Sequence, residues 1–186
     1  MKYNICKFGH PALRRKAEPI AKIDDAVRAL ASDMILTMKE AKGVGLAAQQ
    51  IGLHVQMCVV NLPEEYDFSK PNGARMNPHA TMPMILINPE ILERSGVQTA
   101  EEACLSIPEI SAPVNRAFRI KISFLDINGV KQTLDIKGFL ARVIQHETDH
   151  LNGMLFVDRV SPVKKITLSS KLKRLKKKTE TELGLS

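Results

Sequence analysis

One stretch of sixteen residues, from Gly138 to Gly153, constrains the fold more than any other part of the chain. Its apolar residues recur with a helical period, and a glycine just past the last of them is typical of a helix C-terminus. Inside it lies an H-E-x-x-H sequence, residues 146–150. Because residues i and i+4 share a helix face, His146 and His150 both reach one metal ion, and Glu147 stands beside it to handle protons. The stretch therefore predicts a helix that carries a metal site.

Two histidines four residues apart also occur by chance, and a bare five-residue pattern does not exclude this. The chain has only five histidines, however, and the glutamate stands in place inside a helical pattern. A metal site is therefore the favoured interpretation. The other histidines match no ligand spacing and are expected on the surface or in loops: His10, His54 and His79.

The third metal ligand decides the class of site, since a catalytic divalent metal usually has three protein ligands and an open position. A metzincin would place a third histidine where this chain has Phe156, so that class is excluded. A thermolysin-like site takes a downstream glutamate. The acidic residues that follow are poor candidates: Asp158, then Glu180 and Glu182 in a lysine-rich segment.

The three cysteines offer a better third ligand. Cys6 is N-terminal and Cys58 falls in an apolar run expected to be a buried strand, whereas Cys104 stands beside two glutamates after a segment that looks like a loop. Cys104 is thus the best candidate. An odd number of widely spaced cysteines, with no secretion signal at the start, predicts a reducing cytoplasm.

Length and composition predict one folded core. The 186 residues are 44% hydrophobic and 25% charged, which is ordinary for a globular chain. We expect a single catalytic domain over residues 1–161 and a basic tail over residues 162–186. The longest uncharged run, residues 43–63, carries glycine, glutamine, histidine and asparagine, so a membrane helix is rejected.

Periodicity places the remaining elements. A helix is expected after Asp24, with Met34 and Met38 on its apolar face and Gly43 as its stop. Met57 is expected in the core. Alternation around Asn128-Gly129 predicts a hairpin. The other expected elements are a strand over 55–61, a loop over 62–83, a strand over 85–88 stopped by Pro89, and a last helix from Ser161-Pro162 into the lysine-rich segment. Strands clustered apart from helices indicate an α+β fold.

Taken together, these features resemble the peptide deformylases of bacteria and organelles. Three separated blocks match that family's pattern in order, and the resemblance covers about Phe8 to Val160. The blocks are Gly43-Val44-Gly45-Leu46-Ala47-Ala48-Gln49-Gln50, Glu102-Ala103-Cys104-Leu105-Ser106 and His146-Glu147-Thr148-Asp149-His150. The resemblance implies antiparallel sheets packed around a central metal-binding helix, and removal of the formyl group from the N-terminal formyl-methionine of new polypeptides.

The resemblance also implies the cofactor and the catalytic roles. Cys104, His146 and His150 would hold one Fe²⁺, for which Zn²⁺, Ni²⁺ or Co²⁺ can substitute, and the residue types accept all of these. Glu147 would take a proton from the attacking water and return it to the departing amine. The oxyanion would accept hydrogen bonds from the side chain of Gln50 and the backbone N–H of Leu105.

Substrate binding is expected along the first block. Gly43 and Gly45 let a peptide approach closely and add as a strand, although Gly43 serves equally well as a simple turn after the first helix. The methionine pocket is assigned to Val44, Val143 and the aliphatic stem of Arg142. Arg142 is equally well interpreted as a surface salt-bridge residue.

The chain departs from the family's pattern at two positions. Ala103 stands where the second block normally has glycine, and its methyl group is expected to narrow the groove or, at a positive φ, to add strain. Ser111 stands where bacterial members often carry an arginine that orients the peptide. Neither change touches a metal ligand, so the site is expected to assemble.

The net charge of +7 is concentrated in the tail. Residues 162–186 hold eight Lys or Arg against two Glu, which supplies +6 and leaves the body nearly neutral. The tail is expected to dock on ribosomal RNA near emerging nascent chains, the alternative being an ordinary solvated helix face. Two rival functions remain: an H-E-x-x-H peptidase that cleaves internal bonds, and a noncatalytic RNA-binding module.

Overall fold

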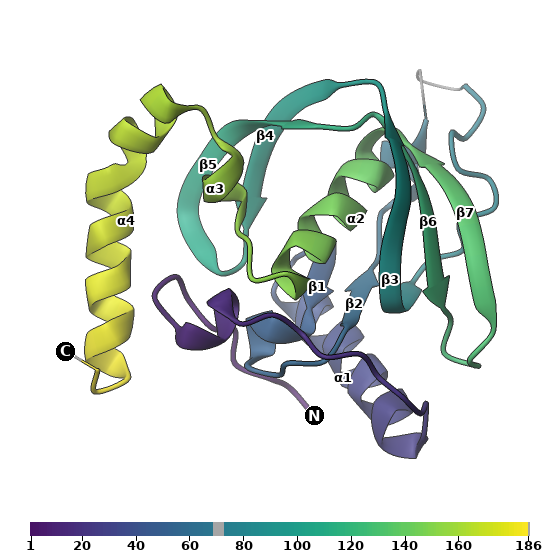
Figure 1. Cartoon of the computed structure of the whole chain (residues 1–186), viewed down its shortest axis with the longest axis horizontal. Coiled ribbons are helices and arrows are strands. Elements are labelled where there is room, and N and C mark those ends of the chain that lie inside the picture. Colours follow the sequence, from purple (N-terminus) through teal and green to yellow (C-terminus); the bar gives the residue numbers. More distant parts are fainter. Residues whose placement is uncertain (69–72, 186) are drawn as a thin grey trace.

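The computed structural model describes residues 1–68 and 73–185, which fold into two antiparallel sheets and several helices (Figure 1). The larger sheet has the order β1-β2-β3-β6-β7, and the smaller pairs β4 with β5. The strands are β1 (Gly45–Ala47), β2 (Met57–Val60), β3 (Met84–Ser95), β4 (Gln98–Cys104), β5 (Ile107–Arg116), β6 (Arg119–Leu125) and β7 (Lys131–Lys137). The helices are α1 (Asp25–Glu40), α2 (Gly138–Leu151), α3 (Phe156–Arg159) and α4 (Pro162–Glu182), with 3₁₀ turns at Pro11–Arg14, Ala48–Ile51 and Glu64–Asp67.

Helix α2 occupies the centre of the molecule. It contacts β1, β2, β6 and β7 of the larger sheet, and in Figure 1 it lies between that sheet and the β4–β5 pair. Thirteen of its fourteen residues are buried. The predicted α+β fold, with antiparallel sheets around a central helix, is confirmed.

Helix α1 begins as its sequence predicts. The Asp24 side chain accepts a hydrogen bond from the backbone N–H of Val27 at 3.0 Å, which satisfies one of the free N–H groups of the first turn. Met34 and Met38 are buried in the core. The helix ends differently from expectation, because Lys42 and not Gly43 takes the left-handed conformation, with φ of 57°.

The strand expected to stop at Pro89 in fact continues to Ser95 as β3. The pairing of β3 with β6 shifts register between Ile87 and Glu90, and Asn88 has φ of 51°. Proline has no N–H to donate to a sheet, and a β-bulge lets the chain pass it without breaking the strand. The hairpin around Asn128-Gly129 is confirmed as β6 and β7.

The segment before Cys104, expected to be loop-like, is the strand β4. Its partner β5 contains Pro108 and Pro113, which obscured the strand signal although inward and outward residues alternate along it. Cys104 is thereby held at a strand end, two residues after Glu102 and on the same side of the strand. Of the loop expected over 62–83, Pro71 and Asn72 lie outside the described residues.

Helix α4 starts where Ser161-Pro162 predicts, and the Ser161 side chain accepts a hydrogen bond from the N–H of Lys164 at 3.3 Å. Leu168 is buried against the β5 and α3 side of the body, with Leu172 and Leu175 packed beside it. Within the described residues no helix is long and apolar enough to cross a membrane. The division into a domain over 1–161 and a tail over 162–186 stays a prediction.

Candidate metal centre

Three side chains from two elements meet beneath the smaller sheet. The sulfur of Cys104, at the end of β4, and ring nitrogens of His146 and His150, on α2, all lie within 4.8 Å of one another, and all three residues are buried. The Cys104 Sγ lies 3.3 Å from His150 Nε2. One thiolate and two imidazoles are a donor set that divalent transition metals accept, so the residues present fit such an ion.

A buried carboxylate orients one of the histidines. Glu102 Oε2 lies 3.0 Å from His146 Nδ1, which leaves Nε2 of that ring for a metal ion. Although burial by itself would raise the pKa of Glu102, hydrogen bonds from Arg116 and His146 hold it at about 2. Glu102 is therefore ionised at neutral pH. Burial also lowers the pKa of His150 well below its usual value, so that imidazole is neutral and has a lone pair for a cation.

Glu147 is poised to exchange a proton near neutral pH. Its carboxyl is buried, which raises the pKa to about 7. Among the described residues its Oε2 has no hydrogen-bond partner, and the side chain lines a cleft. A carboxyl with a pKa near the working pH suits general acid–base chemistry.

Gln50 is fixed beside the cysteine by its own backbone neighbourhood. Its Oε1 accepts a hydrogen bond from the N–H of Ala47 at 2.8 Å. Its Nε2 lies 3.5 Å from Cys104 Sγ, an ordinary distance for a hydrogen bond to sulfur, and 3.4 Å from Ser106 Oγ, which is long for a hydrogen bond to oxygen. The amide N–H groups are therefore presented at the metal centre in a fixed orientation.

The structure gathers the sequence-predicted residues around a cleft of about 300 Å³. His150 lies below the cleft and is not among its lining residues. The predicted residues that line it are Gly43, Val44, Gly45, Gln50, Cys104, Leu105, Arg142, Val143, His146 and Glu147. Lys42, Glu101 and Phe139 also line it, and sequence reasoning did not include them.

Arg142 is not a surface residue, which removes that alternative. It is 2% exposed, and its guanidinium points into the smaller sheet. Ala103 is exposed in the cleft wall and pairs with Ser111 across β4 and β5. Among the described residues Ala103 is not one with a positive φ, so its methyl group adds no backbone strain.

The role of Glu102 was missed by sequence reasoning, as was the arginine that holds it. Arg116 donates to both Glu102 oxygens, from Nε at 2.8 Å and from Nη2 at 2.9 Å, and pairs with Asp149 as well. Arg116 stands at an inward position of a strand whose residues alternate, and a buried cation needs an acidic partner. This pattern could have pointed to a buried acidic residue such as Glu102. That signal could be used only once β5 was recognised as a strand.

A helix with two histidines and a glutamate, completed by a strand cysteine in a cleft, defines the class of metal-dependent hydrolases. Comparison with known proteins identifies the family within that class. The family model described as polypeptide deformylase matches residues 2–166. The chain belongs to the peptide deformylase family, and it is an enzyme of that family.

Individual relatives are similar to this chain over nearly its whole length. The peptide deformylase of Opitutus terrae is 44% identical over 100% of this chain and 99% of its own length. That of Nitrosococcus oceani is 42% identical over 98% of this chain and 97% of its own. Among solved structures, peptide deformylase from Thermotoga maritima has a TM-score of 0.75 and 40% identity, covering 87% of this chain and 99% of that one. A peptide deformylase from Synechococcus elongatus in complex with actinonin has a TM-score of 0.79 and 36% identity, covering 93% and 85%.

Proposed function

We propose that this chain hydrolyses the N-formyl group of formyl-methionine at the N-terminus of newly synthesised polypeptides, releasing formate and a free amine. One observation carries the proposal: the ligand atoms of Cys104, His146 and His150 lie within 4.8 Å of one another, and the cleft beside them is lined by Glu147 and Gln50. Membership of the deformylase family supports the same reaction.

The residues that would hold the cofactor are Cys104, His146 and His150. We propose one Fe²⁺ per chain, with Zn²⁺, Ni²⁺ or Co²⁺ able to substitute, because soft sulfur and imidazole donors accept each of them. When bound, the ion supplies a Lewis acid that acidifies water and polarises the formyl carbonyl.

Glu147 moves the protons of the reaction. It takes one proton from the attacking water and returns it to the nitrogen of the departing amine, so the water oxygen joins the formyl carbon as the carbon–nitrogen bond breaks. A pKa of about 7 supports both roles, since the group accepts and releases a proton near neutral pH. Its Oε2 has no hydrogen-bond partner among the described residues, so this oxygen is available to accept and release a proton.

Gln50 and Leu105 stabilise the negative charge that develops on the formyl oxygen. The Gln50 amide is held through its Oε1, so its N–H groups need little reorganisation to donate. The backbone N–H of Leu105 follows Cys104 directly and is proposed as the second donor.

The substrate is proposed to add as a strand beside Gly43 and Gly45, with its methionine side chain in the cleft. Val44, Val143 and the stem of Arg142 supply apolar wall for that side chain. The aromatic ring of Phe139 extends the same wall.

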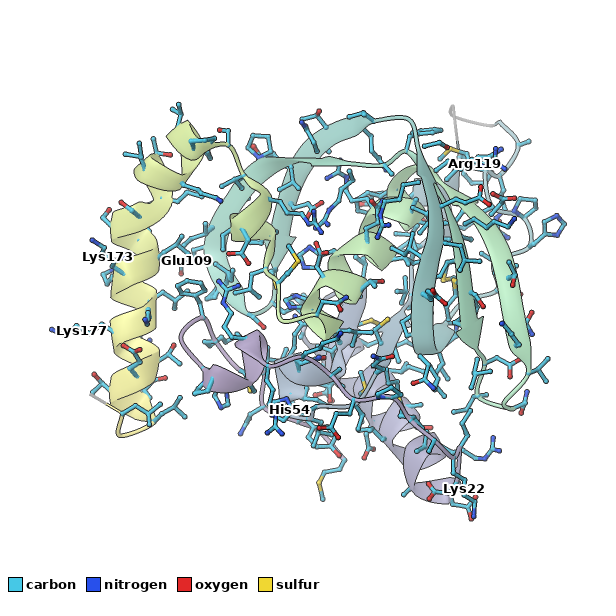
Figure 2. The ribbon with its side chains drawn as sticks, in the orientation of Figure 1. Lys22, His54, Glu109, Arg119, Lys173 and Lys177 are labelled. Atoms are coloured by element: carbon cyan, nitrogen blue, oxygen red, sulfur yellow. The ribbon has the colours of Figure 1, made fainter. Side chains whose placement is uncertain are left out.

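The outer face of α4 is proposed to contact ribosomal RNA in the cytoplasm, where nascent chains emerge. Its basic residues are exposed, and Figure 2 shows Lys173 and Lys177 pointing away from the body. Phosphate contacts make such binding salt-dependent. Co-sedimentation with ribosomes at low salt should fall for Lys173→Glu combined with Lys177→Glu, and equal co-sedimentation would reject the contact.

The test of the reaction is formate release from formyl-Met-Ala-Ser by protein purified without oxygen. Wild type should release formate, and Glu147→Ala should be slower by about 10²- to 10⁴-fold, the usual contribution of general acid–base catalysis. Casein is the control substrate, and its digestion would point to the rival peptidase. No formate from metal-loaded wild type would reject the proposal.

A further inference from the structure

Arg142 carries a buried positive charge whose role is not explained by a methionine pocket. It lies on α2 four residues before His146, with only 2% of its surface exposed. A buried guanidinium is stabilised when its N–H groups find acceptors. Nη1 and Nη2 of Arg142 have acceptors, whereas its Nε has none among the described residues. The position of those acceptors shows what this charge holds together.

Within the described part of the chain, the acceptors of Arg142 belong to the smaller sheet. Nη1 donates to Glu102 Oε1 at 2.6 Å and to the carbonyl of Val114 at 2.9 Å, and Nη2 donates to the carbonyl of Gln98 at 2.8 Å. Gln98 and Glu102 are on β4, and Val114 is on β5. The guanidinium therefore ties α2 to the two-stranded sheet. Figure 1 shows these two elements as neighbours.

This tie joins the elements that supply the metal ligands. Glu102 comes two residues before Cys104 on β4, and its other oxygen contacts His146 Nδ1 at 3.0 Å. Arg142 thus connects the strand of the sulfur ligand to the helix of both imidazoles through one carboxylate. Arg116 also holds Glu102, but it reaches from β5 and not from the metal helix.

We propose that Arg142 is a positioning residue that sets the spacing between Cys104 and the two histidines and fixes Glu102 against His146. It acts through these groups and not on the substrate. The inference rests on the proposed function only in requiring that the site binds a metal ion. Ligands held in place by their hydrogen-bonding neighbours typically bind metal about 10- to 100-fold more tightly.

The test is metal binding, because the stem of Arg142 also lines the cleft and activity would mix the two roles. Oxygen-free apoprotein is titrated with Co²⁺, whose thiolate charge-transfer and d–d bands report the ligand set, and competition with a chelator gives the affinity. Arg142→Met removes the guanidinium at similar size. We expect about 10- to 100-fold weaker Co²⁺ binding and altered d–d bands.

Two further variants separate positioning from stability. Arg142→Lys keeps the charge but cannot bridge three acceptors, so its affinity should lie between those of wild type and Arg142→Met; should Arg142→Met fail to fold, Arg142→Lys decides alone. Arg75→Met is the matched control, because Arg75 donates to the buried Asp67 at 2.9 Å and does not line the cleft. It should lower the melting temperature and leave the Co²⁺ spectrum and affinity at wild-type values.

Wild-type affinity and spectrum in both Arg142 variants would overturn the proposal and leave the proposed function intact. An equal loss in Arg75→Met would also overturn it, since the effect would then follow general stability. Absence of Co²⁺ binding by the wild type would reject the metal centre and the proposed function with it.

Discussion

Helix α2 carries the H-E-x-x-H residues and helix α4 carries most of the net positive charge, yet α2 is buried and α4 is mostly exposed to solvent. Helix α2 buries thirteen of fourteen residues, whereas α4 buries only Leu168 and Thr179 among twenty-one. Three polar residues of α2, Arg142, His146 and Asp149, are held by charged partners from other elements, so one change there disturbs several groups. The basic residues of α4 are exposed, apart from the half-buried Lys164, and exposed charges act nearly independently of one another. Four predictions test this difference.

The largest effect is expected at the metal centre. Gln50→Leu removes the side-chain donor that we propose for the developing oxyanion while keeping the size of the side chain. Formate release should fall by about 10²- to 10³-fold in kcat, as for other oxyanion donors. Metal content should be close to that of wild type, because Gln50 is not one of the three candidate ligand residues. A kcat within twofold of wild type would contradict the assigned role.

Gly45 tests how tightly α2 is packed against β1. A Cβ at this position would clash with Glu147 Oε1 and would lie 2.9 Å from its Cγ, so Gly45→Ala must displace the carboxyl that we propose as the proton carrier. We expect kcat to fall by about 100-fold, the usual consequence of a small misplacement of a reacting group.

Gly43→Ala is the matched control for that variant. Its Cβ would come within 2.7 Å of the end of the Leu105 side chain, which can move aside, and within ordinary contact distance of the Gly45 carbonyl at 3.4 Å, so the loss should be smaller. Equal kcat values for the two variants would show that Glu147 is not held by this contact.

Leu168 tests what attaches α4 to the body. It is 7% exposed and packs with apolar residues of β5 and α3. Leu168→Ala should lower the free energy of unfolding by about 2 to 3 kcal/mol, as for other buried leucines, with kcat unchanged. Urea unfolding measures the first quantity. A change below about 0.5 kcal/mol would mean that α4 is held in another way.

The smallest effect is expected on the outer face of α4. Lys173→Glu combined with Lys177→Glu should change the free energy of unfolding by less than about 0.5 kcal/mol, because both residues are exposed. The kcat on a free peptide should equal that of wild type. A large loss of stability or kcat would remove the contrast between the two helices.

What the sequence predicted well depends on local geometry. The spacing of His146 and His150 is decided by one helical turn, and Ser161-Pro162 begins α4 through backbone groups nearby. The hairpin of β6 and β7 has the same local origin. Such features do not require knowledge of which distant segments pack together.

The features that the sequence did not predict depend on tertiary packing. Glu102, Arg116 and Asp149 lie in three different elements, and their pairing appears only when β4, β5 and α2 come together. Pro89 was read as a strand stop because a bulge that accommodates it has no clear local signal. The sequence places the aliphatic stem of Arg142 in the methionine pocket, but it does not indicate that the guanidinium points into the smaller sheet.

Helix α2 and strand β4 are proposed to build one metal site together. X-ray absorption of protein purified without oxygen, with metal content measured on the same sample, examines the ligands themselves. We expect close to one metal ion per chain, with one sulfur and two imidazole nitrogens among its ligands, and loss of the sulfur signal in Cys104→Ala. Metal well below one equivalent, or an ion with no sulfur neighbour, would contradict that proposal.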